Sequence, residues 1–324
     1  MTPLLQALDV QKSFDVAAGV FSGGKTLKAV DGVSIELMPR ETLGIAGESG
    51  CGKSTLARLL VGLIKPTQGE ILYEGKPLSG MGKRGLSAFR KDVQMIFQDP
   101  FSSLNPRMRV GEIIGEPLAI HGIAGGAVRR ELVVRLMDKV GLAAGHFYRY
   151  PHEFSGGQRQ RIGIARALAV NPRVIVADEP VSALDLSIQA QILNLLRDLR
   201  QELKLSTIFI AHDLSVVRYM SDKIAIMYLG KVVEVAPSEM LFSHYMHPYT
   251  EALFSAIPRV GASPAKRVVL KGDLPSPLMP PSGCPFHTRC PYVSPPLCTE
   301  HAPPLEEKEV GHLAACHFSK KLFY

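Results

Sequence analysis

The stretch GESGCGKS, from Gly47 to Ser54, decides the fold because it fits the spacing GxxxxGK followed by Ser or Thr. The apolar run TLGIA before it predicts a buried strand, and STLARLLVGL after it predicts a helix. Glycines at this place let the backbone curl so that several N–H groups face phosphate oxygens, and the N-terminal end of the helix adds positive charge. The sequence therefore predicts a phosphate-binding loop between a strand and a helix.

The loop also predicts which side chains bind a nucleotide. We expect Lys53 to neutralise the β- and γ-phosphates and the Ser54 hydroxyl to ligate Mg²⁺. Cys51 stands where a small side chain is needed, so we interpret it as a space-filling residue and not as a metal ligand. The nucleotide-binding residues predicted in and beside the loop are Gly47, Glu48, Ser49, Gly50, Cys51, Gly52, Lys53, Ser54 and Thr55.

A second apolar run, RVIVADEP, ends in two carboxylates. Its four apolar residues predict a buried strand, with Asp178 and Glu179 at its end. In a chain that also has a phosphate-binding loop, such a pair indicates ATP hydrolysis. We expect Asp178 to hold the Mg²⁺ shell and Glu179 to orient and deprotonate the attacking water.

The bulk properties set the limits for the fold. The 324 residues allow one large core with a smaller module, and 46% hydrophobic against 21% charged residues favours a globular protein. No stretch approaches the roughly 18 uninterrupted apolar residues of a membrane-spanning helix, and the N-terminus lacks the basic region of a signal peptide, so we expect a cytosolic chain. The net charge of +7 suits nucleic acid, an anionic membrane face or a phosphate ligand without choosing among them.

Strand-like runs alternate with helical patterns along most of the chain. VQMIFQ, VIVADE and STIFIAH are separated by patterns such as SIQAQILNLLRDLRQEL, which predicts an α/β fold with a largely parallel sheet. Between Gln98 and Phe154 the pattern is helical, so we expect an inserted helical subdomain at about residues 99–170. Eleven of the 24 prolines lie between residue 259 and the end. Because proline disfavours helices and central strands, this part predicts a compact extension without a large core of its own.

The stretch FSGGQRQR, residues 154–161, is similar to the LSGGQ signature of ABC ATPases, with Phe154 in place of the usual leucine. Two glycines at the start of a helix offer backbone N–H groups and a positive helix end to phosphate. The resemblance implies that this segment contacts the γ-phosphate of an ATP held by the opposite subunit. The residues concerned are Ser155, Gly156, Gly157 and Gln158.

Further elements follow in the order of the ABC family. The resemblance implies that Gln98 links the Mg²⁺ site to the permease contact, that Asp185 belongs to the inter-subunit loop, and that His212 touches the γ-phosphate. With Ser54 and Asp178, Gln98 completes the expected Mg²⁺ ligands. Phe14 resembles the aromatic residue that stacks on adenine, although Phe21 competes for this role and a plain core aromatic is the other interpretation.

The stretches LNPRMRVGEII, HPYTEAL and LPSPLMPPSGCPFHTRC closely resemble the ATPases of oligopeptide and dipeptide importers, in particular the dipeptide-permease ATPases of the F type. This resemblance covers nearly the whole chain. It implies a P-loop ABC nucleotide-binding domain over residues 1–258, with a RecA-like core, an antiparallel β subdomain and an inserted helical subdomain. An oligopeptide/dipeptide-transporter extension follows over residues 259–324.

The same resemblance implies the partners and the location. In the family, two different ATPases form a heterodimer beneath two permease proteins at the cytoplasmic face of the inner membrane. An extracytoplasmic binding protein delivers the peptide, and ATP hydrolysis is coupled to its uptake.

Four of the five cysteines lie in the extension, at Cys284, Cys290, Cys298 and Cys316. Their spacing lacks the C-x2-C pairs of structural zinc sites and the runs of ferredoxins, but four thiolates can converge if the extension folds around them. The family resemblance implies a [4Fe–4S] cluster, while zinc and metal-free cysteines stay open as alternatives. His287 is a rival ligand, which four thiolates would make unnecessary.

Two other functions fit parts of the sequence. An importer of the same family for nickel, glutathione or another small solute fits equally, because specificity resides in the binding protein and the permeases. A soluble ABC ATPase acting on nucleic acid has only the positive charge in its favour. ABC translation factors carry two nucleotide-binding domains and DNA-repair relatives carry long insertions, whereas this chain has one domain with an insertion of 55 residues. We therefore expect a transporter subunit.

Overall fold

The computed structural model describes residues 2–16, 25–256, 270 and 272–323, which fall into two compact units. The first unit comprises Tyr73–Ile210 with Met1–Leu4 and Leu37–Glu41. The second comprises Leu5–Glu36, Thr42–Leu72 and Ala211–Tyr324. The predicted boundary at residue 258 lies outside the described residues, so the division into residues 1–258 and 259–324 stays a prediction.

The first unit is built on three parallel strands. These are β6 (Val93–Ile96), β7 (Val174–Asp178) and β8 (Ser206–Ile210), hydrogen-bonded in that order. Every residue of β7 and β8 is buried, which explains why VIVA in β7 and IFI in β8 are continuous apolar runs and do not alternate. Asp178 is the last residue of the buried strand β7, and Glu179 directly follows it.

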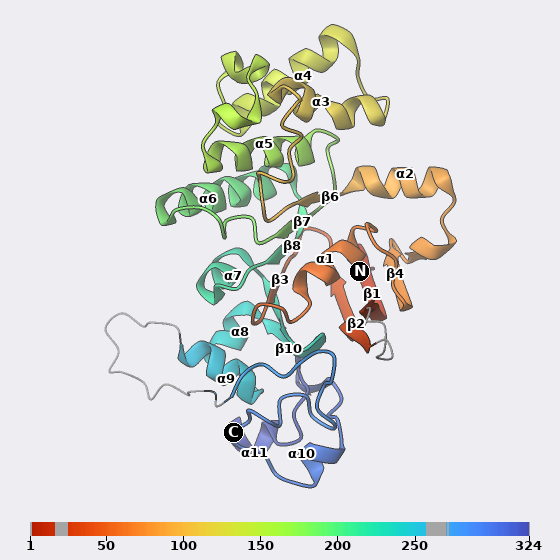
Figure 1. Ribbon diagram of the computed structural model, residues 1–324, viewed down its shortest axis with the longest axis vertical. Helices are drawn as coiled ribbons and strands as arrows, with labels where there is room; N and C mark the ends of the chain where they lie inside the picture. Colours follow the sequence, from red (N-terminus) through yellow and green to blue (C-terminus); the bar gives the residue numbers. More distant parts are fainter. Residues whose placement is uncertain (1, 17–24, 257–269, 271, 324) are drawn as a thin grey trace. The chain divides into compact units, whose positions relative to one another are not determined.

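Helices α3 (Val110–Ile120), α4 (Gly126–Lys139) and α5 (Gly156–Leu168) of the first unit form a packed group, drawn in yellow and green in Figure 1. Helix α3 contacts both α4 and α5, and its core residues Val110 and Ile114 are fully buried with Val133 of α4. This group lies within the helical subdomain predicted at about residues 99–170. The other helices of this unit are α2 (Lys83–Asp92) and α6 (Leu186–Leu203), with short η1 (Leu78–Gly80), η2 (Ala144–Tyr148) and η3 (Pro151–Glu153) and the two-residue strand β5 (Lys76–Pro77).

The second unit contains both parallel and antiparallel pairing. Strand β3 (Thr42–Ala46) runs parallel to β9 (Lys223–Tyr228), and β9 pairs antiparallel with β10 (Lys231–Pro237). In a second sheet, β2 (Lys25–Leu37), β1 (Leu5–Val16) and β4 (Gln68–Tyr73) are neighbours in that order. The helices are α1 (Lys53–Leu60), α7 (Leu214–Met220), α8 (Ser238–Ser243), α9 (Pro248–Ser255), α10 (Leu297–Glu300) and α11 (Ser319–Phe323).

The C-terminal extension joins this unit by strand pairing. Strand β12 (His312–Ala314) pairs antiparallel with β10 and with β11 (Glu306–Glu309), which places Ala314 opposite Glu234. Phe286 is fully buried, with its ring centroid 5.3 Å from that of Tyr228 and 5.5 Å from that of Tyr249. The pairing of β12 with β10 and an aromatic anchor therefore hold the extension to this unit.

The parallel strands within each unit confirm the predicted α/β class. Among the described helices, none is both long enough and apolar enough to cross a membrane.

Candidate functional site

The predicted site residues divide between the two units. The first unit carries Gln98, the pair after β7, the signature segment and the loop with Asp185. The second unit carries the phosphate-binding loop, His212, Phe14 and the four cysteines of the extension.

The predicted loop lies between strand β3 and helix α1, as the sequence indicates. Gly52 has a φ of 106° and caps the helix, and a Cβ there would lie 2.1 Å from the carbonyl oxygen of Ala29. Only glycine fits such a position. The loop therefore presents its backbone amides at the N-terminus of α1, which is an arrangement that binds phosphate.

Lys53 is the first residue of α1 and is only 4% exposed. Its ammonium group donates hydrogen bonds to the carbonyl oxygens of Gly47 at 2.8 Å and Glu48 at 3.0 Å. The buried charge is thus satisfied by the loop itself, and the side chain lies across the loop. The neighbouring Cys51 is 1% exposed, and burial raises the pKa of its thiol, as expected for a residue that fills space.

Glu48 is held from the C-terminal part of the chain. Its amide donates a 2.9 Å hydrogen bond to the Tyr249 hydroxyl. Its carboxylate accepts two hydrogen bonds from the Arg289 guanidinium, at 2.8 and 3.2 Å. Tyr249 is fully buried, and burial raises the pKa of its hydroxyl, which stays protonated at neutral pH.

The carboxylates after β7 are placed for different roles. Asp178 is the last residue of the strand and is 3% exposed. Glu179 turns away from the strand with a φ of 45°, which is unusual for a side chain other than glycine. The turn is fixed because the Glu179 amide donates to the carbonyl oxygen of Ile210 at 2.9 Å and the Ser182 hydroxyl donates to the Glu179 carbonyl at 3.1 Å.

Gln98 lies beside this turn. Its side-chain amide donates to the Glu179 carboxylate at 3.3 Å. The structure therefore brings together Glu179, the predicted general base, and Gln98, the residue expected to link the Mg²⁺ site to the permease contact. Together with Asp178 they supply oxygen ligands of the kind that Mg²⁺ prefers.

The signature segment forms the N-terminus of helix α5. Ser155 caps the helix in a reciprocal arrangement: its hydroxyl accepts from the Gln158 amide at 3.4 Å, and its own amide donates to the Gln158 side chain at 3.1 Å. Phe154 is buried, with its ring edge-on to His146 at a centroid distance of 5.1 Å. The departure from the usual leucine thus keeps a buried apolar anchor before the cap.

The signature glycines abut the loop that carries Asp185. A Cβ on Gly156 would lie 3.2 Å from Leu184, and one on Gly157 would lie 2.5 Å from the Cγ2 atom of Ile188. Asp185 is exposed and immediately precedes helix α6. The structure therefore places the two predicted inter-subunit elements side by side within the first unit.

We expect Gly157→Ala to lower the thermal stability of the chain. The new methyl group collides with β-branched Ile188, and such overpacking typically costs about 1–3 kcal/mol. Gly163→Ala is the matched control on the same helix, because its Cβ would meet nothing within 4 Å and alanine favours a helix by about 0.5–1 kcal/mol. Differential scanning fluorimetry of both variants checks this, and equal melting temperatures would contradict the packing argument.

The predicted contact of His212 with the γ-phosphate and the predicted stacking of Phe14 on adenine stay predictions. His212 is exposed and directly precedes Asp213, whose carboxylate accepts from the Ser215 amide at 2.8 Å to cap helix α7. Phe14 on β1 is 39% exposed, and the Lys12 ammonium lies 5.2 Å from its ring centroid. Phe21, its rival for adenine stacking, lies outside the described residues.

The four cysteines of the extension have free thiols. Burial is the largest cause that raises the pKa of Cys284 to about 11 and of Cys290 to about 12, and the charges of the other thiols of the group add to it. Burial also raises the pKa of Cys316, and Cys298 is 8% exposed. Within the described residues, no three His, Cys, Asp or Glu side chains are arranged to hold a metal ion.

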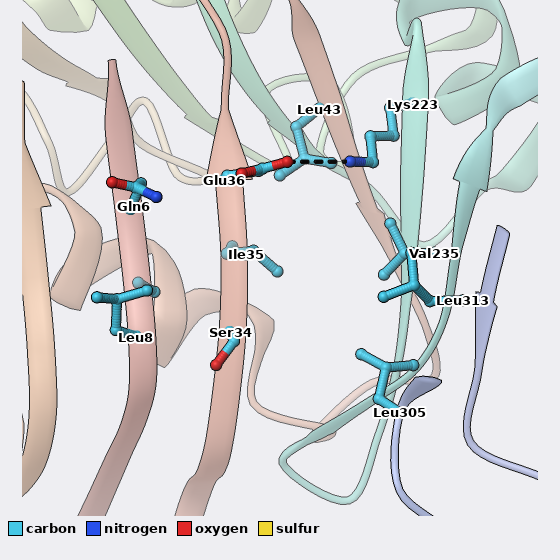
Figure 2. Close-up of a pocket in the computed structure, with 11 residues that line it drawn as sticks. Gln6, Leu8, Ser34, Ile35, Glu36, Leu43, Lys223, Val235, Leu305 and Leu313 are labelled. Atoms are coloured by element: carbon cyan, nitrogen blue, oxygen red, sulfur yellow. Dashed lines mark ion pairs between the residues drawn. The ribbon is translucent and has the colours of Figure 1, made fainter. Parts of the chain in front are cut away.

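A cavity of about 180 Å³ lies elsewhere in the second unit (Figure 2). Ile35 and Leu8 line one side of it and Leu305 and Leu313 of the extension the other, as Figure 2 shows. The ion pair between Glu36 and Lys223, 3.7 Å long, crosses one end. None of the predicted site residues lines this cavity.

Sequence reasoning missed three residues that support the site. Tyr249 and Arg289 hold Glu48, as described above. Arg159 of helix α5 is 9% exposed and donates to the Pro151 carbonyl at 2.7 Å, which fixes the segment before the signature. A signal for Arg159 was present, since a charged residue on the buried face of a helix usually has a partner. Nothing near Arg289 in the sequence points to the loop.

Comparisons with known proteins identify the family. Residues 30–182 match the ABC transporter family, and residues 233–298 match the oligopeptide/dipeptide transporter C-terminal region. The first match includes the phosphate-binding loop, Gln98, the signature and Glu179, and the second includes three of the four cysteines of the extension.

Several curated proteins are similar along almost their whole length. The oligopeptide transport ATP-binding protein AppF of Bacillus subtilis is 51% identical, with 97% of each chain covered. The dipeptide transport ATP-binding protein DppF of Escherichia coli is 50% identical over 97% of this chain and 94% of its own. The oligopeptide transport ATP-binding protein OppF of Escherichia coli is 52% identical, over 94% and 92%.

Solved structures of ABC cassettes share the fold. A dimeric post-hydrolysis structure of the ATP-binding cassette MJ0796 bound to ADP and Pi matches with a TM-score of 0.65 at 29% identity, covering 72% of this chain and 98% of that one. The match confirms the predicted P-loop ABC fold. From these family matches and full-length relatives, the chain belongs to the ABC transporter ATP-binding proteins that carry the oligopeptide/dipeptide transporter C-terminal region.

Proposed function

We propose that the chain is the ATP-hydrolysing subunit of an importer that couples ATP binding and hydrolysis to the uptake of dipeptides or oligopeptides. The observation that carries the ATPase role is the contact of Gln98 with Glu179 at the end of β7, in a chain that also has a complete phosphate-binding loop. The solute class is supported by relatives at about half identity that are named for oligopeptide and dipeptide transport.

The predicted site residues have three different roles in ATP hydrolysis. Lys53 and the amides of its loop bind the β- and γ-phosphates, and His212 contacts the γ-phosphate. Ser54, Gln98 and Asp178 would hold Mg²⁺, which would neutralise charge on the phosphate oxygens. Glu179 accepts a proton from the attacking water, and its carboxylate also accepts from the Gln98 side-chain amide.

The nucleotide site closes against a second, related ATPase. Ser155 to Gln158 offer the N-terminus of α5 to the phosphate of an ATP bound by the partner, and the loop with Asp185 lies at the same interface. Leu186, the first residue of α6, is 84% exposed, and its apolar side chain would be covered by such a partner. The cassette MJ0796 was solved as a dimer, which supports pairing of this kind.

The helical group around α3 and α4 transmits the closing motion of the nucleotide site to the permease. Gln98 lies at the start of the segment that leads to α3, so a change at Glu179 is transmitted to it. Ile120 and Val128 in this group are 73% and 60% exposed. Apolar exposure there suits a docking surface for permeases, which would hold the chain at the cytoplasmic face of the inner membrane.

Co-purification separates this proposal from the alternatives. We expect the tagged chain to bring down two membrane proteins and one further ATPase from detergent-solubilised membranes. Recovery with nucleic acid and without membrane proteins would favour a soluble ABC ATPase, for which the net charge of +7 is the supporting feature. An importer for nickel, glutathione or another small solute would bring down the same kinds of partner but respond to a different solute.

We also propose that Cys284, Cys290, Cys298 and Cys316 bind a [4Fe–4S] cluster with a structural or regulatory role. Four thiols in one segment match the ligand number of such a cluster. The charges of the other thiols in the group raise the pKa values of Cys284 and Cys290. The raised pKa values of Cys284, Cys290 and Cys316 mean that these free thiols are protonated at neutral pH, so they would have to lose their protons to ligate iron.

Cys290→Ser is expected to abolish the visible absorption and the bound iron of anaerobically purified protein while the ATP site still forms. The serine hydroxyl is a poor ligand for iron in place of a thiolate. Cys51→Ala is the matched control, since Cys51 lies outside the extension and should leave the spectrum unchanged. An unchanged spectrum in Cys290→Ser, or no iron in the wild type, would contradict the cluster.

A further inference from the structure

An ion pair joins the extension to the phosphate-binding loop. The Arg289 guanidinium donates to both carboxylate oxygens of Glu48, at 2.8 and 3.2 Å. Arg289 lies one residue before Cys290, and Glu48 is the second residue of the loop. The contact thus joins two segments that are 241 residues apart in the sequence.

The pair has the features of a strong interaction. Its geometry is bidentate, which is the most favourable arrangement for arginine and a carboxylate. The Arg289 side chain is 9% exposed and that of Glu48 is 28% exposed, so solvent screens the pair less than an ordinary surface ion pair. Such a contact fixes the position of the carboxylate.

Glu48 is held at three points. Its amide is bound by Tyr249, its carbonyl oxygen accepts from the Lys53 ammonium at 3.0 Å, and its carboxylate is bound by Arg289. Two of these three partners come from the part of the second unit beyond Ala211. A change at Arg289 therefore acts on the residue that also contacts the phosphate-binding lysine.

Charge gives the pair a second consequence. A carboxylate in a loop that binds phosphates repels them unless a cation neutralises it, and the repulsion is large where water is partly excluded. Arg289 supplies that cation. Loss of Arg289 would leave Glu48 unpaired and would weaken nucleotide binding through both repulsion and loop mobility.

We propose that Arg289 is a positioning residue of the ATP site, acting through Glu48, so that the C-terminal extension forms part of the apparatus that binds the nucleotide. This rests on the proposed ATPase function. It assigns to the extension a role in nucleotide affinity that does not depend on whether the cysteines carry a cluster.

The test is MgATP binding to the full-length chain by isothermal titration calorimetry, together with the KM for ATP in hydrolysis assays. We expect Arg289→Ala to weaken MgATP binding about tenfold and to raise KM with little change in kcat, because truncating one partner of a buried charge pair leaves the other uncompensated. Arg289→Lys should bind MgATP with an affinity between that of Arg289→Ala and that of the wild type. Glu48→Gln alone should weaken MgATP binding less than Arg289→Ala does, because the neutral amide oxygen still accepts from Arg289 and does not repel phosphate.

The double variant Arg289→Ala/Glu48→Gln separates positioning from mere stability. We expect it to recover the part of the lost affinity that is due to repulsion, because the neutral amide no longer repels phosphate, and to lack the part that is due to loop mobility. Arg218→Ala is the control, since Arg218 makes a more exposed ion pair with Glu239 at 3.0 Å and should leave binding unchanged.

Wild-type affinity in Arg289→Ala would overturn the proposal. So would equal weakening in the single and double variants with a lowered melting temperature, because that result indicates a structural role only. If the wild-type chain itself fails to bind MgATP, the proposed ATPase function fails instead, and the two failures are distinguishable.

Discussion

Glu179→Gln is expected to lower the rate of ATP hydrolysis by about 10²–10⁴-fold while MgATP stays bound, because a positioned general base contributes about that much. The amide keeps the shape of the side chain and the turn at φ 45° but cannot accept the proton of the attacking water. The variant should accumulate as a closed, ATP-bound dimer. Single-turnover hydrolysis and size-exclusion chromatography with ATP measure the two effects.

Glu131→Gln on helix α4 is the control for Glu179→Gln. Glu131 is exposed and pairs with Arg135 one turn along the same helix, so its loss should leave turnover near that of the wild type. Near-normal turnover in Glu179→Gln would overturn the assignment of the base.

Lys53→Ala is expected to weaken MgATP binding about 100-fold or more, and hydrolysis should fall below detection at ordinary ATP concentrations. The ammonium is expected to form charge-assisted bonds to two phosphates, each worth about 1.5–3 kcal/mol. Nucleotide titration followed by calorimetry or a fluorescent analogue gives the affinity.

The fold of Lys53→Ala must be intact for this result to bear on the site. Within the described structure, the oxygen atoms that accept hydrogen bonds from the buried Lys53 ammonium are carbonyl oxygens of its own loop. The substitution should therefore leave the unit folded. Lys231→Ala provides a matched control, since Lys231 is 41% exposed and pairs with Asp31 at 2.8 Å. Binding of MgATP by Lys53→Ala with wild-type affinity would contradict the role of the loop.

The parts of the site that the sequence predicted are those fixed by local spacing. The loop from Gly47 to Ser54 follows from one strand, one helix and glycines at fixed offsets, and Gly52 indeed has a conformation that favours glycine. The strand before Asp178 was predictable because a strand buried on both faces has a continuous apolar sequence.

The contacts of the extension were not predictable, because they join residues far apart in the chain. Strand β12 has only three residues, too few for an alternating pattern, yet its pairing with β10 attaches the extension. His312 and Glu234 are both buried and form a pair with 2.7 Å between Nε2 and Oε1, which explains why polar residues occur on these buried strands. The sequence around either residue does not predict that the other is its partner.

Backbone strain was equally hidden from the sequence. The left-handed turn at Glu179 depends on the hydrogen bonds of its amide and carbonyl to Ile210 and Ser182, which tertiary structure supplies. The sequence predicts that the Glu179 carboxylate is the base, but nothing in it indicates the positive φ of this residue.

The most direct test of the account is the ATPase activity of the chain reconstituted in vesicles with its permeases and partner ATPase. We predict that a binding protein loaded with a dipeptide or oligopeptide raises the rate of hydrolysis and that the peptide accumulates on the side of the membrane where ATP is hydrolysed. Glu179→Gln should abolish both effects. Hydrolysis that is indifferent to the permeases and to every peptide, or that responds to nucleic acid instead, would contradict the account.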